Sequence, residues 1–256
     1  MKITGIILDM DGVIWKENQP IGDLPNIFTE IRRKGLRFTL ATNNAVRTIP
    51  AFMEKLAAMG VEVQPQEIIN SAMAAAHILK EKFPQGGPVY MVGEEGLTTA
   101  LAEKGFYPSD DHVLAVVAGL DRRFTFKKLF RANHHIRCGA FFIGTNPDRT
   151  FPTPNGFVPG AGSILAAIEA ASETIPFIAG KPSPGLYNLA LERLGTPLEN
   201  TLAIGDRLET DILGAQQMGC RSALVLSGVT TMEMAVKWQP QPDLIGEDLA
   251  GIINQL

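Results

Sequence analysis

The run Ile3-Thr4-Gly5-Ile6-Ile7-Leu8-Asp9-Met10-Asp11-Gly12-Val13 joins a short apolar segment to two carboxylates near the start of the chain. A second run of this kind, Thr201-Leu202-Ala203-Ile204-Gly205-Asp206-Arg207-Leu208-Glu209-Thr210-Asp211, lies near the end. Each apolar part has the length of a buried β-strand, and each stops at a carboxylate pair. In open parallel α/β sheets, ligands bind just outside the carboxyl ends of the strands. The two runs therefore predict that four carboxylates meet at one edge of a sheet.

Four carboxylates in one place repel one another unless a cation or a proton separates them. Because all the ligands are oxygens, the expected ion is Mg²⁺. A calcium loop of the EF-hand type does not fit, since the next alternate position is Val13 and the twelfth is Pro20 rather than an acid. Two simpler interpretations stay open: a plain Asp-Gly turn after the first strand, and Asp206 as a helix cap with Asp211 in the first helical turn.

The composition is that of an ordinary globular protein of 256 residues, with 45% hydrophobic and 20% charged residues. The net charge of −4 argues against a nucleic-acid-binding protein, which normally has a basic face. Cys138 and Cys220 suit two buried thiols in a reducing compartment better than a disulfide framework or a zinc site. No run reaches the roughly 20 apolar residues of a membrane span, and the apolar stretch before Asp9 is too short for a signal peptide. We expect a cytoplasmic protein that binds neither nucleic acid nor membrane.

Two more polar groups follow predicted strands. Thr42-Asn43-Asn44 comes after the strand 37–41, and a hydroxyl with exposed N–H groups suits an anion, although Asn-rich turns are common. Lys181 lies between Gly180 and Pro182 at the end of the strand 176–179, where a lysine can neutralise a phosphate as a point charge. Alone, Thr42-Asn43-Asn44 and Lys181 are each weak indications of a phosphate site. The order in which the four motifs follow one another along the chain is the stronger indication.

Strand and helix patterns alternate along the chain, which favours a mainly parallel sheet. Among these elements we predict helices at 24–34, at 72–83 with Ser71 as its N-cap, and at 209–218, and a loop at 144–159. One strand–helix–strand unit needs roughly 30 residues, but the stretch between Thr42 and Lys181 exceeds this by about 100 residues, a domain-sized surplus. We therefore predict a Rossmann-like α/β core made of residues 1–79 and 178–256. A second α/β domain, residues 80–177, is inserted into it, with Pro84-Gln85-Gly86-Gly87-Pro88 as the linker.

The succession of acid pair, threonine, lysine and acid pair resembles the haloacid dehalogenase superfamily of phosphohydrolases over nearly the whole chain. Asp9–Val13, Thr42, Lys181 and Gly205–Asp211 are similar to its four motifs in that order. The residues around the last three motifs look more narrowly like subfamily IIA, which holds the 4-nitrophenylphosphatase and NagD-like enzymes. That branch has an α/β cap of type C2, which fits the insertion and the segment Gly144-Thr145-Asn146-Pro147-Asp148.

This resemblance implies a Mg²⁺-dependent phosphomonoester hydrolase that acts on small phosphorylated metabolites, with 4-nitrophenyl phosphate as an artificial substrate. Asp9 would attack phosphorus and form an aspartyl-phosphate. Asp11 would protonate the leaving oxygen and later deprotonate water. By the same resemblance, Mg²⁺ would be held by Asp9, the backbone carbonyl of Asp11 and Asp206, with Asp211 orienting ligands or water from outside the ligand set.

The remaining motif residues would handle the phosphate. Thr42 and the Asn43 amide would bind phosphoryl oxygens, and Lys181 would offset the charge on phosphate and nucleophile. Similar enzymes often form dimers through the cap, so a homodimer is a further expectation.

Two other classes of protein compete with this interpretation. A C–halogen hydrolase would also use an aspartate nucleophile, but it needs neither Asp11 nor Mg²⁺. A non-catalytic phosphometabolite-binding protein would keep the phosphate ligands without turnover. His134-His135 lies on a predicted helix, where adjacent positions do not share a face, so we expect no metal site there.

Overall fold

The computed structural model describes residues 2–153 and 156–256. Two compact units account for the chain: a first unit of Met1–Thr42, Pro50–Ile69 and Tyr187–Leu256, and a second unit of Asn43–Ile49 and Asn70–Leu186. Residues of each unit are grouped because they contact one another more than they contact the other unit. The predicted division into a core of 1–79 with 178–256 and an inserted domain of 80–177 remains a prediction.

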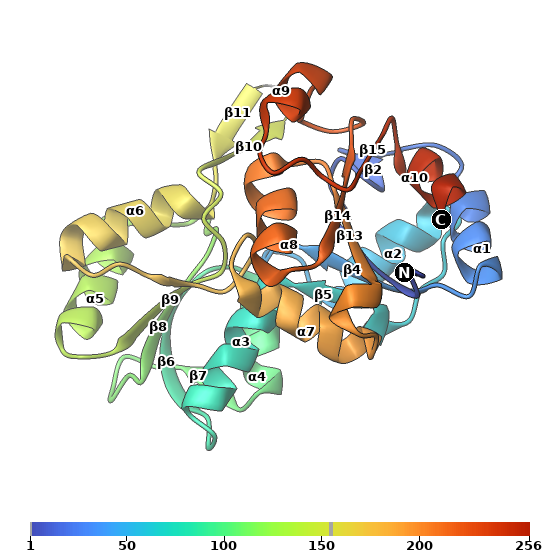
Figure 1. The fold of residues 1–256 in the computed structure, drawn as a ribbon. Helices are drawn as coiled ribbons and strands as arrows, with labels where there is room; N and C mark the ends of the chain where they lie inside the picture. Colours follow the sequence, from blue (N-terminus) through green and yellow to red (C-terminus); the bar gives the residue numbers. More distant parts are fainter. Residues whose placement is uncertain (1, 154–155) are drawn as a thin grey trace. The chain divides into compact units, whose positions relative to one another are not determined.

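The first unit is built on a six-stranded sheet in the order β15-β14-β13-β1-β4-β5 (Figure 1). Its strands are β1 (Gly5–Leu8), β4 (Arg37–Thr42), β5 (Ile68–Asn70), β13 (Thr201–Gly205), β14 (Arg221–Val225) and β15 (Leu244–Gly246). The pairs of β1 with β13 and β4, and of β14 with β13 and β15, are parallel. Strand order reverses at β1, which is the kind of position where open α/β sheets bind ligands.

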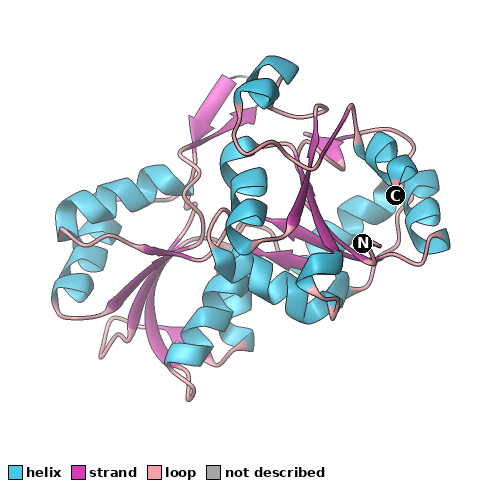
Figure 2. Cartoon of the chain, viewed as in Figure 1, coloured by secondary structure: helices cyan, strands magenta, loops and turns pink. Residues whose placement is uncertain are grey.

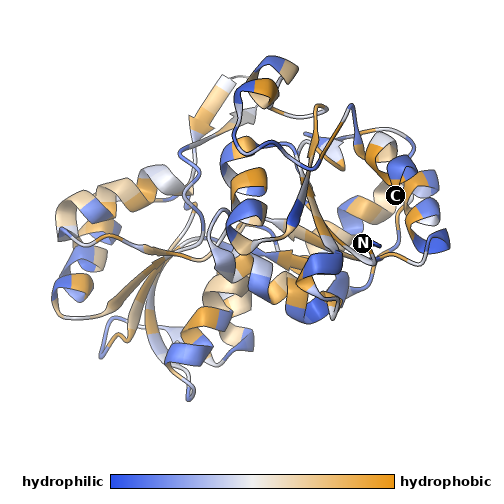
Figure 3. Ribbon diagram, viewed as in Figure 1, coloured by the Kyte–Doolittle hydropathy of each residue, from blue (hydrophilic) through white to orange (hydrophobic). Residues whose placement is uncertain are grey.

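Apolar residues dominate the central strand, because both of its faces are covered. All four residues of β1 are buried, as expected for a strand of a parallel sheet with helices on both sides. Figure 3 shows apolar colours along the strands, whereas outer helices such as α1 (Leu24–Arg33) carry both apolar and hydrophilic colours.

Helix α1 forms where the sequence predicted a helix. The side chain of Asp23 accepts a hydrogen bond from the Asn26 N–H and caps the helix, while Pro25 lies in the first turn. The buried residues follow helical spacing and face the core; they are Leu24, Ile27, Phe28 and Ile31. Gly35 follows the helix with φ +69°, a conformation that favours glycine.

The other helices of the first unit fill the connections between strands. They are α2 (Ile49–Ala58, whose first residue belongs to the second unit), α8 (Leu213–Met218), α9 (Met232–Lys237) and α10 (Leu249–Gln255), with short 3-10 helices at Pro65–Glu67 and Leu198–Asn200 and a π-helix at Leu208–Ile212. Helix α7 (Pro184–Leu194) belongs in part to each unit.

A five-stranded sheet in the order β12-β9-β8-β6-β7 forms the centre of the second unit (Figure 2). Its strands are β6 (Gly87–Val92), β7 (Phe106–Pro108), β8 (Ala115–Ala118), β9 (Phe141–Gly144) and β12 (Phe177–Ile178), all paired in parallel. Its helices are α3 (Ser71–Lys82), α4 (Glu95–Glu103), α5 (Phe126–Arg137) and α6 (Ala161–Ser172). Ala132 and Ile136 of α5 and Ile168 of α6 pack with Val116 and Phe142 of the sheet in one buried cluster.

The structure confirms the predicted α/β class with mainly parallel sheets, and it corrects several local expectations. The expected loop 144–159 contains the hairpin β10 (Thr150–Thr153) and β11 (Gly156–Pro159). A second hairpin, β2 (Trp15–Lys16) and β3 (Gln19–Pro20), was not predicted either. The cap of α3 is Asn70, whose side chain accepts from the Met73 N–H, rather than Ser71.

Two other findings concern the class of protein. None of the helices in the described part of the chain is long and apolar enough to cross a bilayer. Both cysteines are free, as expected, but Cys138 is exposed and only Cys220 is buried. Burial raises the pKa of the Cys220 thiol to about 11.

Candidate active site

Asp9 and Thr42 lie at the carboxyl ends of neighbouring strands of the first unit. The Asp9 N–H donates to the Ile204 carbonyl at 2.9 Å and so extends the pairing of β1 with β13 by one residue. Thr42 is the last residue of β4, which lies on the other side of β1 and pairs Leu40 with Leu8. Because these strands are parallel, both side chains lie at their carboxyl ends, as the sequence predicted.

The structure brings Asp9, Asp206 and Asp211 together. One carboxylate oxygen from each lies within 4.8 Å of the other two, and within residues 2–153 and 156–256 no other three Asp, Glu, His or Cys side chains converge in this way. Their side chains are largely withdrawn from solvent, with residue exposures of 9%, 1% and 4%. Carboxylates this close repel one another unless a proton or a cation lies among them. A buried set of oxygen donors fits Mg²⁺, which prefers such ligands.

Backbone groups and two glycines hold Asp206 in place. Its Oδ2 accepts the Val229 N–H at 2.7 Å, and its carbonyl accepts the Thr230 N–H at 3.3 Å. A Cβ added to Gly12 would lie 2.4 Å from Asp206 Oδ2, and a Cβ added to Gly228 would lie 1.9 Å from it. The carboxylate therefore occupies space that only glycine at both positions leaves open.

Asp211 is fixed by the turn that follows β13. Its Oδ2 accepts the Arg207 N–H at 3.1 Å, and its backbone carbonyl accepts the hydroxyl of buried Tyr187 at 2.7 Å. The segment adopts a π-helix from Leu208 to Ile212 before α8 begins, where the sequence predicted one continuous helix from 209 to 218. Short π-helical turns recur at functional sites, because they shift side chains relative to an α-helix.

Asp11 lies outside this group of three carboxylates. It is exposed, and its Oδ1 accepts the indole N–H of Trp15 at 2.8 Å. The Trp15 ring is buried, and the Lys55 ammonium lies over it in a cation–π contact, 4.0 Å from the ring centroid. This role of Trp15 was not predicted, although a tryptophan four residues after a predicted acid offered a signal.

In the second unit, the Asn43 side chain holds the backbone of Lys181. Asn43 Oδ1 accepts the Lys181 N–H at 2.8 Å, and Asn43 Nδ2 donates to the Lys181 carbonyl at 3.0 Å. The same Nδ2 lies 3.2 Å from Asp148 Oδ2. We call this set of contacts among Asn43, Lys181 and Asp148 the asparagine clamp. The sequence predicted that the Asn43 amide binds phosphate, and it did not predict these contacts.

Neighbouring residues fix the asparagine clamp in turn. The Asn43 carbonyl accepts the Ser71 hydroxyl at 2.6 Å and Asn146 Nδ2 at 2.7 Å. A Cβ at Gly180 would lie 2.5 Å from the Thr145 carbonyl and 2.6 Å from Asn43 Oδ1, so the close approach needs glycine. Lys181 itself is 4% exposed.

Comparison with known families and structures agrees with this arrangement. A haloacid dehalogenase-like hydrolase model matches residues 6–107, and a HAD-hydrolase-like model matches residues 178–252. The acid sugar phosphatase of Staphylococcus aureus (strain MRSA252) is 35% identical over 98% of this chain and 96% of its own length. The chain belongs to the haloacid dehalogenase superfamily. Relatives named as phosphatases and structural neighbours of subfamily IIA make the chain a phosphatase of that branch.

Other haloacid dehalogenase phosphatases match as closely. The dihydroxyacetone phosphatase of Corynebacterium glutamicum (strain R) is 38% identical over 88% of this chain and 81% of its own length. The p-nitrophenyl phosphatase of Archaeoglobus fulgidus superposes with a TM-score of 0.94 at 30% identity and covers both chains fully. A glycerol phosphate phosphatase from Mycobacterium tuberculosis, solved with magnesium, has a TM-score of 0.91 at 34% identity, over 98% of this chain and 76% of its own.

The packing around Asp206 generates a prediction. In Gly228→Ala the new Cβ displaces the carboxylate, so we expect Mg²⁺ affinity to fall by about tenfold or more, as when the support of a metal ligand is removed. Titration calorimetry of the folded variant measures this. Gly251→Ala is the matched control, since its Cβ would lie 3.6 Å from the nearest atom, in ordinary contact. Unchanged Mg²⁺ affinity in Gly228→Ala would show that Asp206 holds no ion.

The asparagine clamp generates a second prediction. Asn43→Ala removes both bonds to the Lys181 backbone, and we expect kcat/KM to fall by about tenfold or more on every ester tested, since one lost hydrogen bond is worth about 1 kcal/mol. Asn200→Ala, which removes a 2.8 Å bond to the Lys2 carbonyl, should leave kcat/KM unchanged. If Asn43 acts through Lys181, the double variant with Lys181→Ala loses no more than Lys181→Ala alone. Additive losses would rule out positioning.

Proposed function

We propose that this phosphatase hydrolyses phosphomonoesters of small phosphorylated metabolites, using Mg²⁺ and an aspartyl-phosphate on Asp9. The observation that carries the proposal is the buried convergence of Asp9, Asp206 and Asp211 at the carboxyl end of the central strands. Further support comes from relatives named for sugar, dihydroxyacetone and glycerol phosphate substrates.

In the proposed mechanism, a carboxylate oxygen of Asp9 attacks phosphorus while the bond from phosphorus to the ester oxygen breaks. The leaving oxygen takes a proton from Asp11. Asp11, now a carboxylate, then takes a proton from the water that attacks the aspartyl-phosphate. This second displacement releases inorganic phosphate and restores Asp9. The exposure of Asp11, and the indole N–H of Trp15 that holds one of its oxygens, support a role in proton transfer with solvent.

The other motif residues bind and neutralise charge in this proposal. The Thr42 hydroxyl and the main-chain amide N–H of Asn43 donate to phosphoryl oxygens, and the Lys181 ammonium balances negative charge as it shifts towards the leaving group. Bound to Asp9, the Asp11 carbonyl and Asp206, Mg²⁺ would supply electrostatic stabilisation to nucleophile and phosphate. Asp211 orients ligands through its own fixed position beside Asp206.

The metal and the location of the protein are part of the same proposal. The oxygen-only ligand set and the magnesium complex of a similar phosphatase support Mg²⁺. Two free thiols support a reducing compartment such as the cytoplasm.

The nucleophile is tested by Asp9→Asn, which keeps the shape of the side chain and removes its charge. We expect kcat with 4-nitrophenyl phosphate to fall by at least about 10³, as when other catalytic groups are removed. Asp248→Asn is the matched control, because asparagine caps a helix as well as aspartate and Asp248 caps α10. Normal turnover by a folded Asp9→Asn protein would exclude the aspartyl-phosphate.

The metal is tested by its removal. Exhaustive chelation should abolish turnover of 4-nitrophenyl phosphate, and added Mg²⁺ should restore it. Ca²⁺ should restore it poorly, because calcium prefers more and longer ligand bonds. Mg²⁺ should also raise Tm, since it binds the folded state. Full turnover after chelation would contradict the proposed Mg²⁺ dependence.

A further inference from the structure

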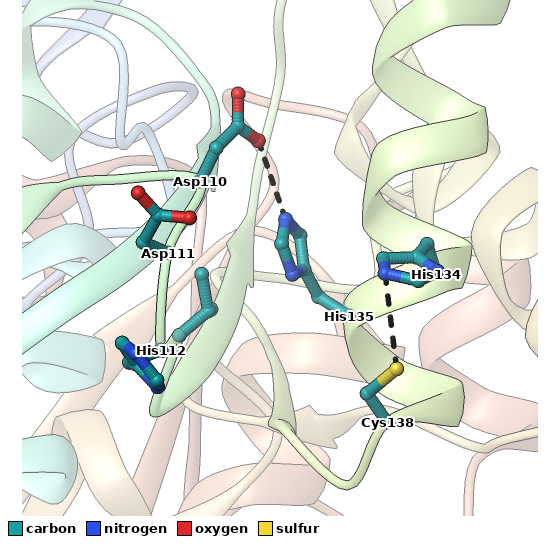
Figure 4. A pocket seen from close by; sticks show the side chains of 7 residues that line it. Asp110, Asp111, His112, His134, His135 and Cys138 are labelled. Atoms are coloured by element: carbon teal, nitrogen blue, oxygen red, sulfur yellow. Dashed lines mark hydrogen bonds and ion pairs between the residues drawn. The ribbon is translucent and has the colours of Figure 1, made fainter.

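A cavity of about 330 Å³ in the second unit gathers side chains that bind metals. It lies between the turn that joins β7 to β8 and the last turn of α5 (Figure 4). The residues that line it include Asp110, Asp111, His112, His134, His135 and Cys138. None of these residues belongs to the phosphatase motifs, so the cavity has no part in the proposed hydrolysis.

His134 and Cys138 form a ready pair of ligands on α5. They are four residues apart on the helix, and Figure 4 shows their side chains turned toward each other. His134 Nε2 lies 3.8 Å from Cys138 Sγ. A tetrahedral ion with usual bonds to histidine nitrogen and cysteine sulfur holds those two atoms about 3.6 Å apart. The pair can therefore close on one ion with little movement, and both residues are exposed to solvent.

His135, also on α5, contacts Asp110 of the turn that forms the other wall of the cavity. It is 7% exposed, its Nε2 lies 3.3 Å from Asp110 Oδ1, and its ring lies 5.1 Å from that of Tyr90. Burial first, and then the charge of Asp110, raises the pKa of the Tyr90 phenol. His134 and His135 thus line one cavity, although we expected adjacent helical residues to be separated. Both side chains reach the cavity because the turn at 110–113 lies beside the last turn of α5.

The turn offers a further ligand across the cavity. His112 and Asp111 are exposed, so their side chains can change rotamer. Among the described residues, no third His, Cys, Asp or Glu ligand atom lies within 4.8 Å of both members of the His134–Cys138 pair. Binding a third protein ligand therefore requires a side-chain rotation, which exposed residues make at low cost.

We propose that His134 and Cys138 bind one divalent transition-metal ion of the zinc class, with His112 or Asp111 as a third ligand and water as the fourth. Mixed nitrogen and sulfur donors select such ions, whereas Mg²⁺ prefers oxygen. Binding displaces the thiol proton of Cys138 to solvent. The ion ties the turn between β7 and β8 to α5 and stabilises the second unit.

The test is a titration of the whole, Mg²⁺-saturated protein with Co²⁺ as a spectroscopic substitute for zinc. We expect one Co²⁺ per chain, a near-ultraviolet band from thiolate-to-cobalt charge transfer, and loss of that band on adding Zn²⁺. Oxygen ligands give no such band, so the Asp9, Asp206 and Asp211 group does not contribute to it. Cys138→Ser should remove the band, and His134→Ala should raise the Kd for Co²⁺ by at least about tenfold.

Two control variants separate this site from other thiols and histidines. Cys220→Ala should keep the band, because Cys220 is buried and its thiol donates to the Thr201 carbonyl. His77→Ala should leave the Kd unchanged, since His77 has the same helical spacing to Glu81, which is a carboxylate and not a thiol. No band in the wild-type protein, a band that survives Cys138→Ser, or an unchanged Kd in His134→Ala would overturn the proposal.

The third ligand is assigned by single variants at the turn. We expect either His112→Ala or Asp111→Ala to raise the Kd for Co²⁺, whereas Glu81→Ala, an exposed control elsewhere in the second unit, should not. If neither turn variant changes the Kd, the turn contributes no ligand and that part of the proposal is wrong.

Discussion

Mutual repulsion among three buried carboxylates is the constraint on which the rest of the first unit depends. Asp9, Asp206 and Asp211 come from both ends of the sequence and meet because β1 and β13 are neighbours in a parallel sheet. The contacts around Asp206 and Asp211 hold these carboxylates in place: backbone N–H groups donate hydrogen bonds to their oxygens, and glycines leave room for them. A fold that tolerates this local cost is arranged to be completed by a cation.

The sequence predicted the α/β class and the meeting of these carboxylates for a clear physical reason. Strands buried on both faces are apolar throughout, so Gly5–Leu8 and Thr201–Gly205 stand out and end where polarity begins. Parallel strands then bring their ends to one edge. The order of motifs identified the superfamily, since no single motif was specific enough.

Other features could not be predicted because they depend on contacts between residues far apart, or on very short elements. The asparagine clamp joins positions 138 residues apart. The local sequence does not distinguish an asparagine that hydrogen-bonds to a distant backbone from one that binds an anion. Strands β2 and β3 have two residues each, too few for periodicity. The π-helix at Leu208–Ile212 has the composition of an ordinary helix start. His134 and His135 line one cavity together with a turn at 110–113, and the helical pattern of α5 contains no sign of that contact.

The asparagine clamp also bears on how such a protein can be built or rebuilt. Asn43 and Lys181 bracket one long segment, and hydrogen bonds join the two ends directly to each other. A segment whose ends already touch can be cut out of one host and spliced into a loop of another without pulling the host open, which is why close termini favour insertion and permutation. In this chain the hydrogen bonds between Asn43 and Lys181 hold the two ends of the segment together. An exchange of the segment between proteins should therefore preserve both residues.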